Sequence, residues 1–118
     1  MLQADHRVVL LQHGGLDNLR GKTGLAMLRH RPGPIVAVVD PDHADRSLEE
    51  VTGIARSVPV VGALSDALVF QPDVAVVGLA PSGGLLPPPL RRDVLAALQA
   101  GLHVASGLHT RLSDDPEL

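Results

Sequence analysis

The sequence predicts an α/β fold with a parallel sheet, and two observations carry that prediction. Short, valine-rich apolar runs recur along the 118 residues, and they are continuous rather than alternating, as in strands covered on both faces. Segments with helical spacing of apolar residues separate these runs. Such alternation implies right-handed crossovers between parallel strands. We therefore expect one Rossmann-like domain over residues 1–118, a three-layer sandwich whose five strands run in the order 3-2-1-4-5.

Five apolar runs supply the expected strands. In chain order they span residues 7–12, 34–40, 58–62, 73–80 and 102–107, and the third run is the weakest. All are far shorter than the ~20 apolar residues that a membrane helix needs, and the N-terminus has no signal-peptide pattern. We therefore expect a soluble, cytoplasmic protein without a membrane partner.

Helical patterns follow the first and second strands. Leu25 and Leu28 share one face of a helix that ends before Pro32. Ser47 and Glu50 have the spacing of a capping box, which predicts that a helix begins there. Both helices are expected to be short.

Two further helices are expected nearer the C-terminus. Ser65 or Asp66 is the expected N-cap of a short helix that runs to Phe70. A longer helix is expected to begin near prolines 87–89 and to end at Gly101. Its apolar stripe holds Leu90, Val94, Ala97 and Leu98, and Arg91, Arg92, Asp93 and Gln99 are expected to lie mostly on the other side.

The composition excludes several classes of function. The net charge is −3 with histidine neutral, so no basic surface for DNA or RNA is expected. Phe70 is the only aromatic residue, which removes the stacking platforms that bind single-stranded nucleic acids. The chain has no cysteine and therefore no disulfide or thiolate chemistry. A small molecule or another protein is the expected kind of partner.

Gly21-Lys22-Thr23 looks like the end of a phosphate-binding loop. That motif, G-x-x-x-x-G-K-[ST], would place its first glycine at position 16. Leu16 stands there, and Gly15 comes one residue too early. We therefore expect Lys22 and Thr23 to be ordinary first-turn residues of the first helix rather than part of an NTPase site.

A dinucleotide-binding fingerprint is matched only in part. No G-x-G-x-x-G follows the first strand, and His13 stands where a small residue would let a pyrophosphate approach. Asp40 ends the second strand, where an acid would hold a ribose hydroxyl. Binding of NAD(P) therefore stays open as an alternative.

The loops after the strands form the expected ligand-binding edge, because open α/β sheets bind ligands outside the carboxyl ends of their strands. The Ser-Gly-Gly turn after the fourth strand can expose backbone N–H groups, which suits a phosphate or carboxylate. Alternatively, its glycines only permit a tight turn. The candidate ligand-binding residues are His13, Gly14, Gly15, Asp40, Ser82, Gly83, Gly84, Ser106 and His109.

The histidines of this edge lack the spacing of a metal site. His13, His43 and His109 stand on three separate loops, so no metal is expected. An imidazole titrates near neutral pH, and His13 or His109 could therefore act as a general base. No nucleophile stands beside either of them. The catalytic residues stay unknown, and the sequence predicts a binding edge rather than a complete reaction centre.

The C-terminus carries a helix-start pattern. Asp114 and Glu117 have capping spacing with Pro116 in the first turn, and the sequence ends at Leu118. A helix nucleus is unfavourable alone. We therefore expect this chain to be the N-terminal domain excised from a longer two-domain protein.

Two stretches of the sequence resemble the prokaryotic domain-of-unknown-function 1611 family. They are GLAPSGGLLPP at 78–88 and AGLHVASGLH at 100–109, and LSDDPE follows the second. The resemblance covers nearly all of residues 7–118. It implies that a C-terminal P-loop NTPase-like domain is this domain's partner in the full-length protein. Some members are described as D-glutamate N-acetyltransferases, which implies acetyl-CoA or a nucleotide as a cofactor of the full-length protein. The stretch ALQAGLHVASG is also similar to dehydrogenase-type Rossmann domains such as that of dihydrodipicolinate reductase.

Three hypotheses of function follow. The first is a binding module, inactive alone, that contributes an edge for a substrate or a small anion and makes subunit contacts in a homo-oligomer. The second is the NAD(P)- or acyl-CoA-binding half of an enzyme. The third is a structural or oligomerisation domain. Titration with NAD(H), NADP(H), acetyl-CoA and ATP separates the first two.

Overall fold

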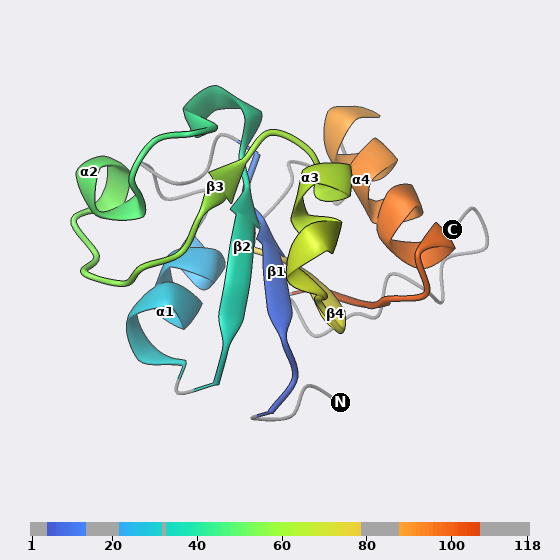
Figure 1. The fold of residues 1–118 in the computed structure, drawn as a ribbon, viewed down its shortest axis with the longest axis horizontal. Coiled ribbons are helices and arrows are strands. Elements are labelled where there is room, and N and C mark those ends of the chain that lie inside the picture. Colours follow the sequence, from blue (N-terminus) through green and yellow to red (C-terminus); the bar gives the residue numbers. More distant parts are fainter. Residues whose placement is uncertain (1–4, 14–21, 32, 79–87, 107–118) are drawn as a thin grey trace.

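The computed structural model describes residues 5–13, 22–31, 33–78 and 88–106 (Figure 1). Its sheet has five parallel strands in the order β3-β2-β1-β4-β5, which confirms the predicted fold class and topology. Each strand lies inside the apolar run expected for it. The strands are β1 Val8–Leu11, β2 Ile35–Val39, β3 Val60–Val61, β4 Val74–Val77 and β5 His103–Ser106.

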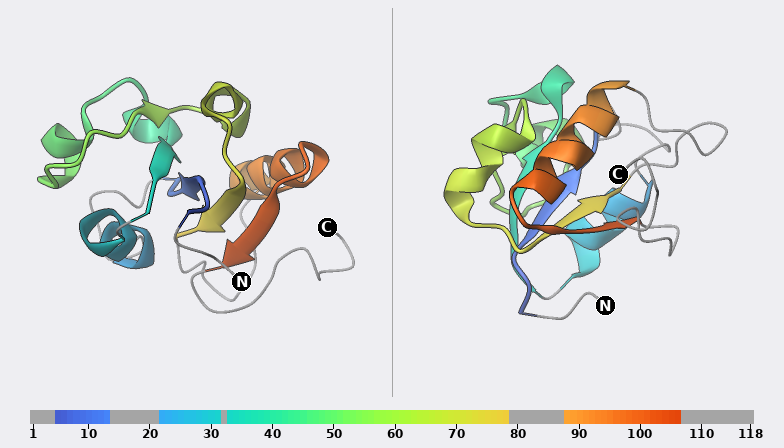
Figure 2. Two further views of the ribbon diagram at one scale, coloured as in Figure 1. Left: turned by 60° about the horizontal axis from the view of Figure 1, so that its bottom comes forward. Right: turned by 90° about the vertical axis from the view of Figure 1, so that its right-hand side faces the viewer.

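Helices cover both faces of this sheet, as the predicted three layers require (Figure 2). The longest helix begins at the predicted prolines, and Gly101 follows it with a φ of +84°. No helix in the described part of the chain is long and apolar enough to cross a membrane. The helices are α1 Lys22–His30, α2 Leu48–Thr52, α3 Leu64–Ala67 and α4 Pro88–Gln99, with 3₁₀ turns η2 Pro41–His43 and η3 Leu68–Phe70.

Successive residues of the central strand enter two separate cores. Val9 and Leu11 pack in the core that α3 and α4 cover. Val8 and Leu10 pack in the core that α1 and α2 cover. All four side chains are fully buried, because side chains alternate between the faces of a strand and both faces are covered. This burial explains why the strands read as continuous apolar runs.

The predicted N-cap of α2 is confirmed. The Oγ atom of Ser47 accepts a hydrogen bond from the backbone N–H of Glu50 at 3.4 Å. The Glu50 carboxylate pairs with Arg46 at 2.7 Å instead of returning to the cap. Half of the capping box therefore forms, and the other half is replaced by an exposed ion pair.

The predicted N-cap of α3 is wrong. The helix has Ala63 at its N-cap, so neither Ser65 nor Asp66 holds that position. The backbone N–H of Leu64 donates instead to Oδ1 of Asp93, on α4, at 3.1 Å. The acceptor is 29 residues away, beyond the reach of a local capping pattern.

Two glycines bring α1 against the carboxyl ends of β1 and β4. The backbone N–H of Gly24 donates to the carbonyl of Gly78 at 3.2 Å. The side chain of Gln12 is fully buried beside both glycines. A Cβ atom added to either glycine would stand 1.8 Å from the Gln12 Oε1 atom. The close approach therefore requires glycine at both positions.

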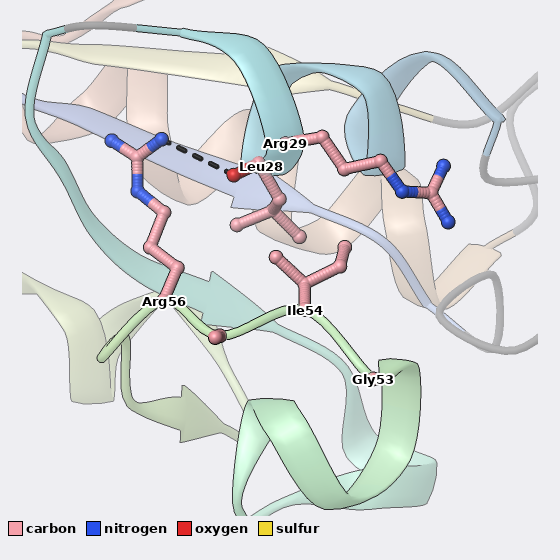
Figure 3. A pocket seen from close by; sticks show the side chains of 6 residues that line it. Leu28, Arg29, Gly53, Ile54 and Arg56 are labelled. Carbon is pink, nitrogen blue, oxygen red and sulfur yellow. Dashed lines mark hydrogen bonds between the residues drawn. The ribbon is translucent and has the colours of Figure 1, made fainter.

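Arg56 ties the C-terminal end of α1 to the loop before β3. Its guanidinium donates to the carbonyl oxygens of Leu28 at 3.3 Å, Arg31 at 2.8 Å and Gly33 at 2.6 Å. Figure 3 shows Arg56 reaching the Leu28 carbonyl while the side chain of Arg29 extends the other way. Burial, and then the charge of Arg56, lowers the pKa of Arg31. One carbonyl in the last turn of α1 and two carbonyls of the segment after it are thus bonded by a cation.

Replacing Arg56 with methionine is expected to lower the free energy of unfolding by about 2 kcal/mol, because three carbonyls lose a charged donor. Urea denaturation of the variant measures this loss. Arg29→Met is the matched control, since its exposed side chain lines the same open hollow of about 410 Å³. The control is expected to change stability by less than about 0.5 kcal/mol. Equal losses in the two variants would contradict the role given to Arg56.

Candidate ligand-binding edge

The carboxyl ends of the strands lie along one edge of the sheet, where the sequence predicts the ligand. Three of the predicted site residues are described there: His13 after β1, Asp40 after β2 and Ser106 at the end of β5, paired in register with Val77. The others lie outside the described residues, as does the helix start expected near the C-terminus. They are Gly14, Gly15, Ser82, Gly83, Gly84 and His109.

His13 leaves β1 in an unusual backbone conformation. Its φ is +22°, a region that residues other than glycine rarely adopt. Its backbone N–H donates to the Val39 carbonyl at 3.2 Å, beside the bond from Gln12 to the same oxygen at 2.9 Å. This turn directs the imidazole toward α4, on the face of the sheet that α3 and α4 cover.

Asp93 receives the His13 side chain. The Nε2 atom of His13 lies 2.6 Å from Oδ2 of Asp93, and each side chain is only 10% exposed. The second carboxylate oxygen accepts the N–H of Leu64. One buried carboxylate therefore connects the end of β1, the start of α3 and the middle of α4.

Asp93 was expected on the polar side of its helix, and that prediction is wrong because the residue is buried. Its spacing holds a signal for this burial. Asp93 is three residues after Leu90, one before Val94 and four before Ala97, so it lies within the apolar stripe of α4. A charged residue in such a stripe needs a buried partner. His13 and the Leu64 N–H are those partners.

Asp40 is held away from the edge by its own turn. Its side chain is fully buried; Oδ1 accepts the N–H of Asp42 at 3.0 Å, and Oδ2 lies 2.8 Å from Nδ1 of His43. These contacts cap η2. A carboxylate that binds ribose hydroxyls must present its oxygens to the ligand. The position of Asp40 therefore does not favour the dinucleotide alternative.

His13 and His43, the two described histidines among the three predicted at this edge, have different partners. His13 pairs with Asp93 on α4, whereas His43 pairs with Asp40 in the η2 turn. Among the described residues, no group of three or more potential ligands could hold a metal ion. Lys22 and Thr23 begin α1, as expected of first-turn residues. The described residues at this edge therefore include two separate carboxylate–imidazole pairs.

Among the described residues, the carboxylate–imidazole pair at the switch point of the sheet is that of His13 and Asp93. In the observed strand order, β1 lies between β2 and β4. From β1 the chain adds β2 and β3 on one side, and it later adds β4 and β5 on the other side. The switch point is therefore at β1 and β4. Ligands of open α/β sheets bind at such a point. His13 lies two residues after the end of β1, so its imidazole is the described side chain best placed to meet a ligand.

Comparisons with known proteins agree with this fold. A family model described as "Domain of unknown function (DUF1611_N) Rossmann-like domain" matches residues 41–118. The chain is also similar to the crystal structure of a DUF1611 family protein from Anabaena variabilis ATCC 29413, with 46% identity and a TM-score of 0.90. That similarity covers 99% of this chain and 34% of the solved one, so the chain spans about a third of that relative. No curated protein matches the sequence.

Proposed function

Because this chain belongs to the DUF1611 family as its Rossmann-like N-terminal domain, we propose that it contributes a ligand-binding edge to a longer cytoplasmic protein. The ligand is a small organic molecule with an anionic group. The observation that carries this proposal is the hydrogen bond between His13 and the buried carboxylate of Asp93, at the switch point of the sheet.

Two properties of the pair support a role beyond folding. A non-glycine residue with positive φ costs stability, and such residues cluster at functional sites. A buried carboxylate also costs desolvation, and apolar residues of similar size often stabilise a protein equally well. The chain keeps both features at the position where its fold class binds ligands.

We also propose an activity for the longer protein, based on the family resemblance. This domain would act together with a C-terminal P-loop domain and contact other subunits of a homo-oligomer. The longer protein would use acetyl-CoA or a nucleotide, with N-acetylation of an amino acid as the candidate reaction. The domain would supply a binding edge and be inactive alone.

Thermal unfolding with added ligands tests the binding edge. The probes are inorganic phosphate, acetyl-CoA, ATP, NAD(H) and NADP(H). A probe at 100 times its dissociation constant is expected to stabilise the fold by about 2.7 kcal/mol. His13→Asn is expected to reduce that stabilisation, whereas Arg29→Met, at the other end of α1, is expected to keep it. Equal stabilisation of both variants would place the ligand elsewhere.

The alternatives give different results in the same titration. Stabilisation by NAD(H) or NADP(H) that depends on Asp40 would support a cofactor-binding half of an enzyme. Stabilisation by no probe, together with dimerisation that rises with protein concentration, would support a structural or oligomerisation domain. Either result would replace the binding edge proposed for His13.

A further inference from the structure

We propose that Asp93 sets the tautomer of His13, so that the Nδ1 atom of the neutral imidazole accepts a hydrogen bond from an amine or hydroxyl of the ligand. This inference rests on the proposed function, since it names the ligand chemistry of the same edge. Asp93 is then a positioning residue, because it acts through His13. The ligand class is a small acid that also carries a hydroxyl or an amino group.

One proton lies between the side chains of His13 and Asp93. Nε2 of His13 and Oδ2 of Asp93 are 2.6 Å apart, so one of them must donate. The other oxygen, Oδ1, already accepts the Leu64 N–H. An ionised carboxylate has only acceptors, and accepting at both oxygens suits that form. The proton therefore lies on Nε2 of the imidazole.

The opposite ring nitrogen of His13, Nδ1, is then an acceptor. A neutral imidazole carries one proton, so a proton on Nε2 leaves Nδ1 with a lone pair. Within the described residues, the His13 ring makes no hydrogen bond other than the one to Asp93. A lone pair attracts an N–H or O–H and repels a bare carboxylate. The ligand group that meets Nδ1 must therefore carry a proton.

Replacing the Asp93 carboxylate with an amide is expected to reverse the tautomer of His13. In Asp93→Asn the buried N–H of Leu64 still needs an acceptor, and the amide has only one oxygen. That oxygen turns to Leu64, so the amide NH₂ faces Nε2 of His13 and donates to it. The ring must then carry its proton on Nδ1. One substitution thus converts the ligand-facing nitrogen from an acceptor into a donor.

Nitrogen-15 NMR of the histidine rings tests this assignment without a ligand. His13→Gln identifies the signals, because it removes one of six histidines. At alkaline pH the neutral His13 ring of the wild type is expected to carry its proton on Nε2, and that of Asp93→Asn on Nδ1. A wild-type ring protonated on Nδ1, or on both nitrogens, would overturn the proposal. The same tautomer in both proteins would also overturn it.

A set of matched probes tests the ligand class. Acetate, glycolate and glycine share a carboxylate, but only glycolate and glycine add a hydroxyl or an ammonium. Both are expected to bind the wild type at least tenfold more tightly than acetate, and Asp93→Asn is expected to lose or reverse this preference. Equal binding of all three would overturn the ligand class. Binding of none of them, with the expected tautomers observed, would count against the proposed function and leave the role of Asp93 standing.

Discussion

Replacing Gly78 with alanine is expected to lower the free energy of unfolding by about 3 kcal/mol, the upper end of the usual cost of overpacking, because the site cannot yield easily. The new Cβ atom would stand 1.8 Å from the Gln12 Oε1 atom and 2.8 Å from the Cα atom of Gly24. A side-chain end can move, but the Gly24 backbone belongs to α1 and is bonded to the Gly78 carbonyl. The helix must therefore shift away from the sheet. Denaturant unfolding followed by circular dichroism measures the loss.

Gly24 and Gln12 provide the internal control for this result. The three heavy atoms nearest to a Cβ at Gly24 all belong to the flexible side chain of Gln12, at 1.8 to 2.6 Å. Adding Gln12→Ala is therefore expected to recover part of the stability lost in Gly24→Ala, and to recover less in Gly78→Ala. Gly62→Ala should be nearly neutral, because its Cβ would lie 3.7 Å from that of Ala44. Equal recovery in both double variants would contradict the backbone clash.

Asp93→Ala is the second substitution with a large expected effect. It removes the acceptor of the buried Leu64 N–H and the partner of His13 at once. Removing one partner of a buried, hydrogen-bonded charged group lowers the free energy of unfolding by about 3 kcal/mol. Chemical denaturation measures that loss. Asp93→Asn is expected to lose about 1 kcal/mol, because the amide oxygen keeps the bond to Leu64.

Asp66→Ala serves as the matched control for this acid. Asp66 lies in the first turn of α3, close to the same helix start, but its side chain is exposed. Its favourable interaction with the helix dipole is expected to contribute about 0.5 kcal/mol. A loss in Asp93→Ala no greater than that of Asp66→Ala would show that the buried carboxylate does not hold α3 in place.

The fold could be predicted because its signals are local. These signals act on neighbouring residues, so their effect can be read from the sequence around them. They are the runs of valine, the prolines at the start of α4 and the cap Ser47. The strand order followed from the alternation of strands and helices and from the handedness of crossovers. The packing of Gln12 between two glycines could not be predicted, because the three residues meet only after β1, α1 and β4 assemble.

The candidate site could be predicted only in part for the same reason. His13 was found because it directly follows a strand, and that position is visible in the sequence. Its partner Asp93 was assigned to the wrong side of α4: its spacing matches the apolar stripe, but its charge outweighed that spacing in the prediction. Asp40 was placed correctly at the strand end, but its carboxylate turns into η2, and only three-dimensional contacts reveal that.

The carboxylate shared by β1, α3 and α4 has a consequence for how this domain opens. Regions joined by buried hydrogen bonds tend to unfold together as one cooperative unit, or foldon. The side chain nearest to the proposed ligand therefore belongs to the same foldon as Leu64 and the core of α4, and is not an independent surface group. A ligand that draws His13 outward would loosen the start of α3, so binding at the rim and local order in this half of the domain are thermodynamically linked.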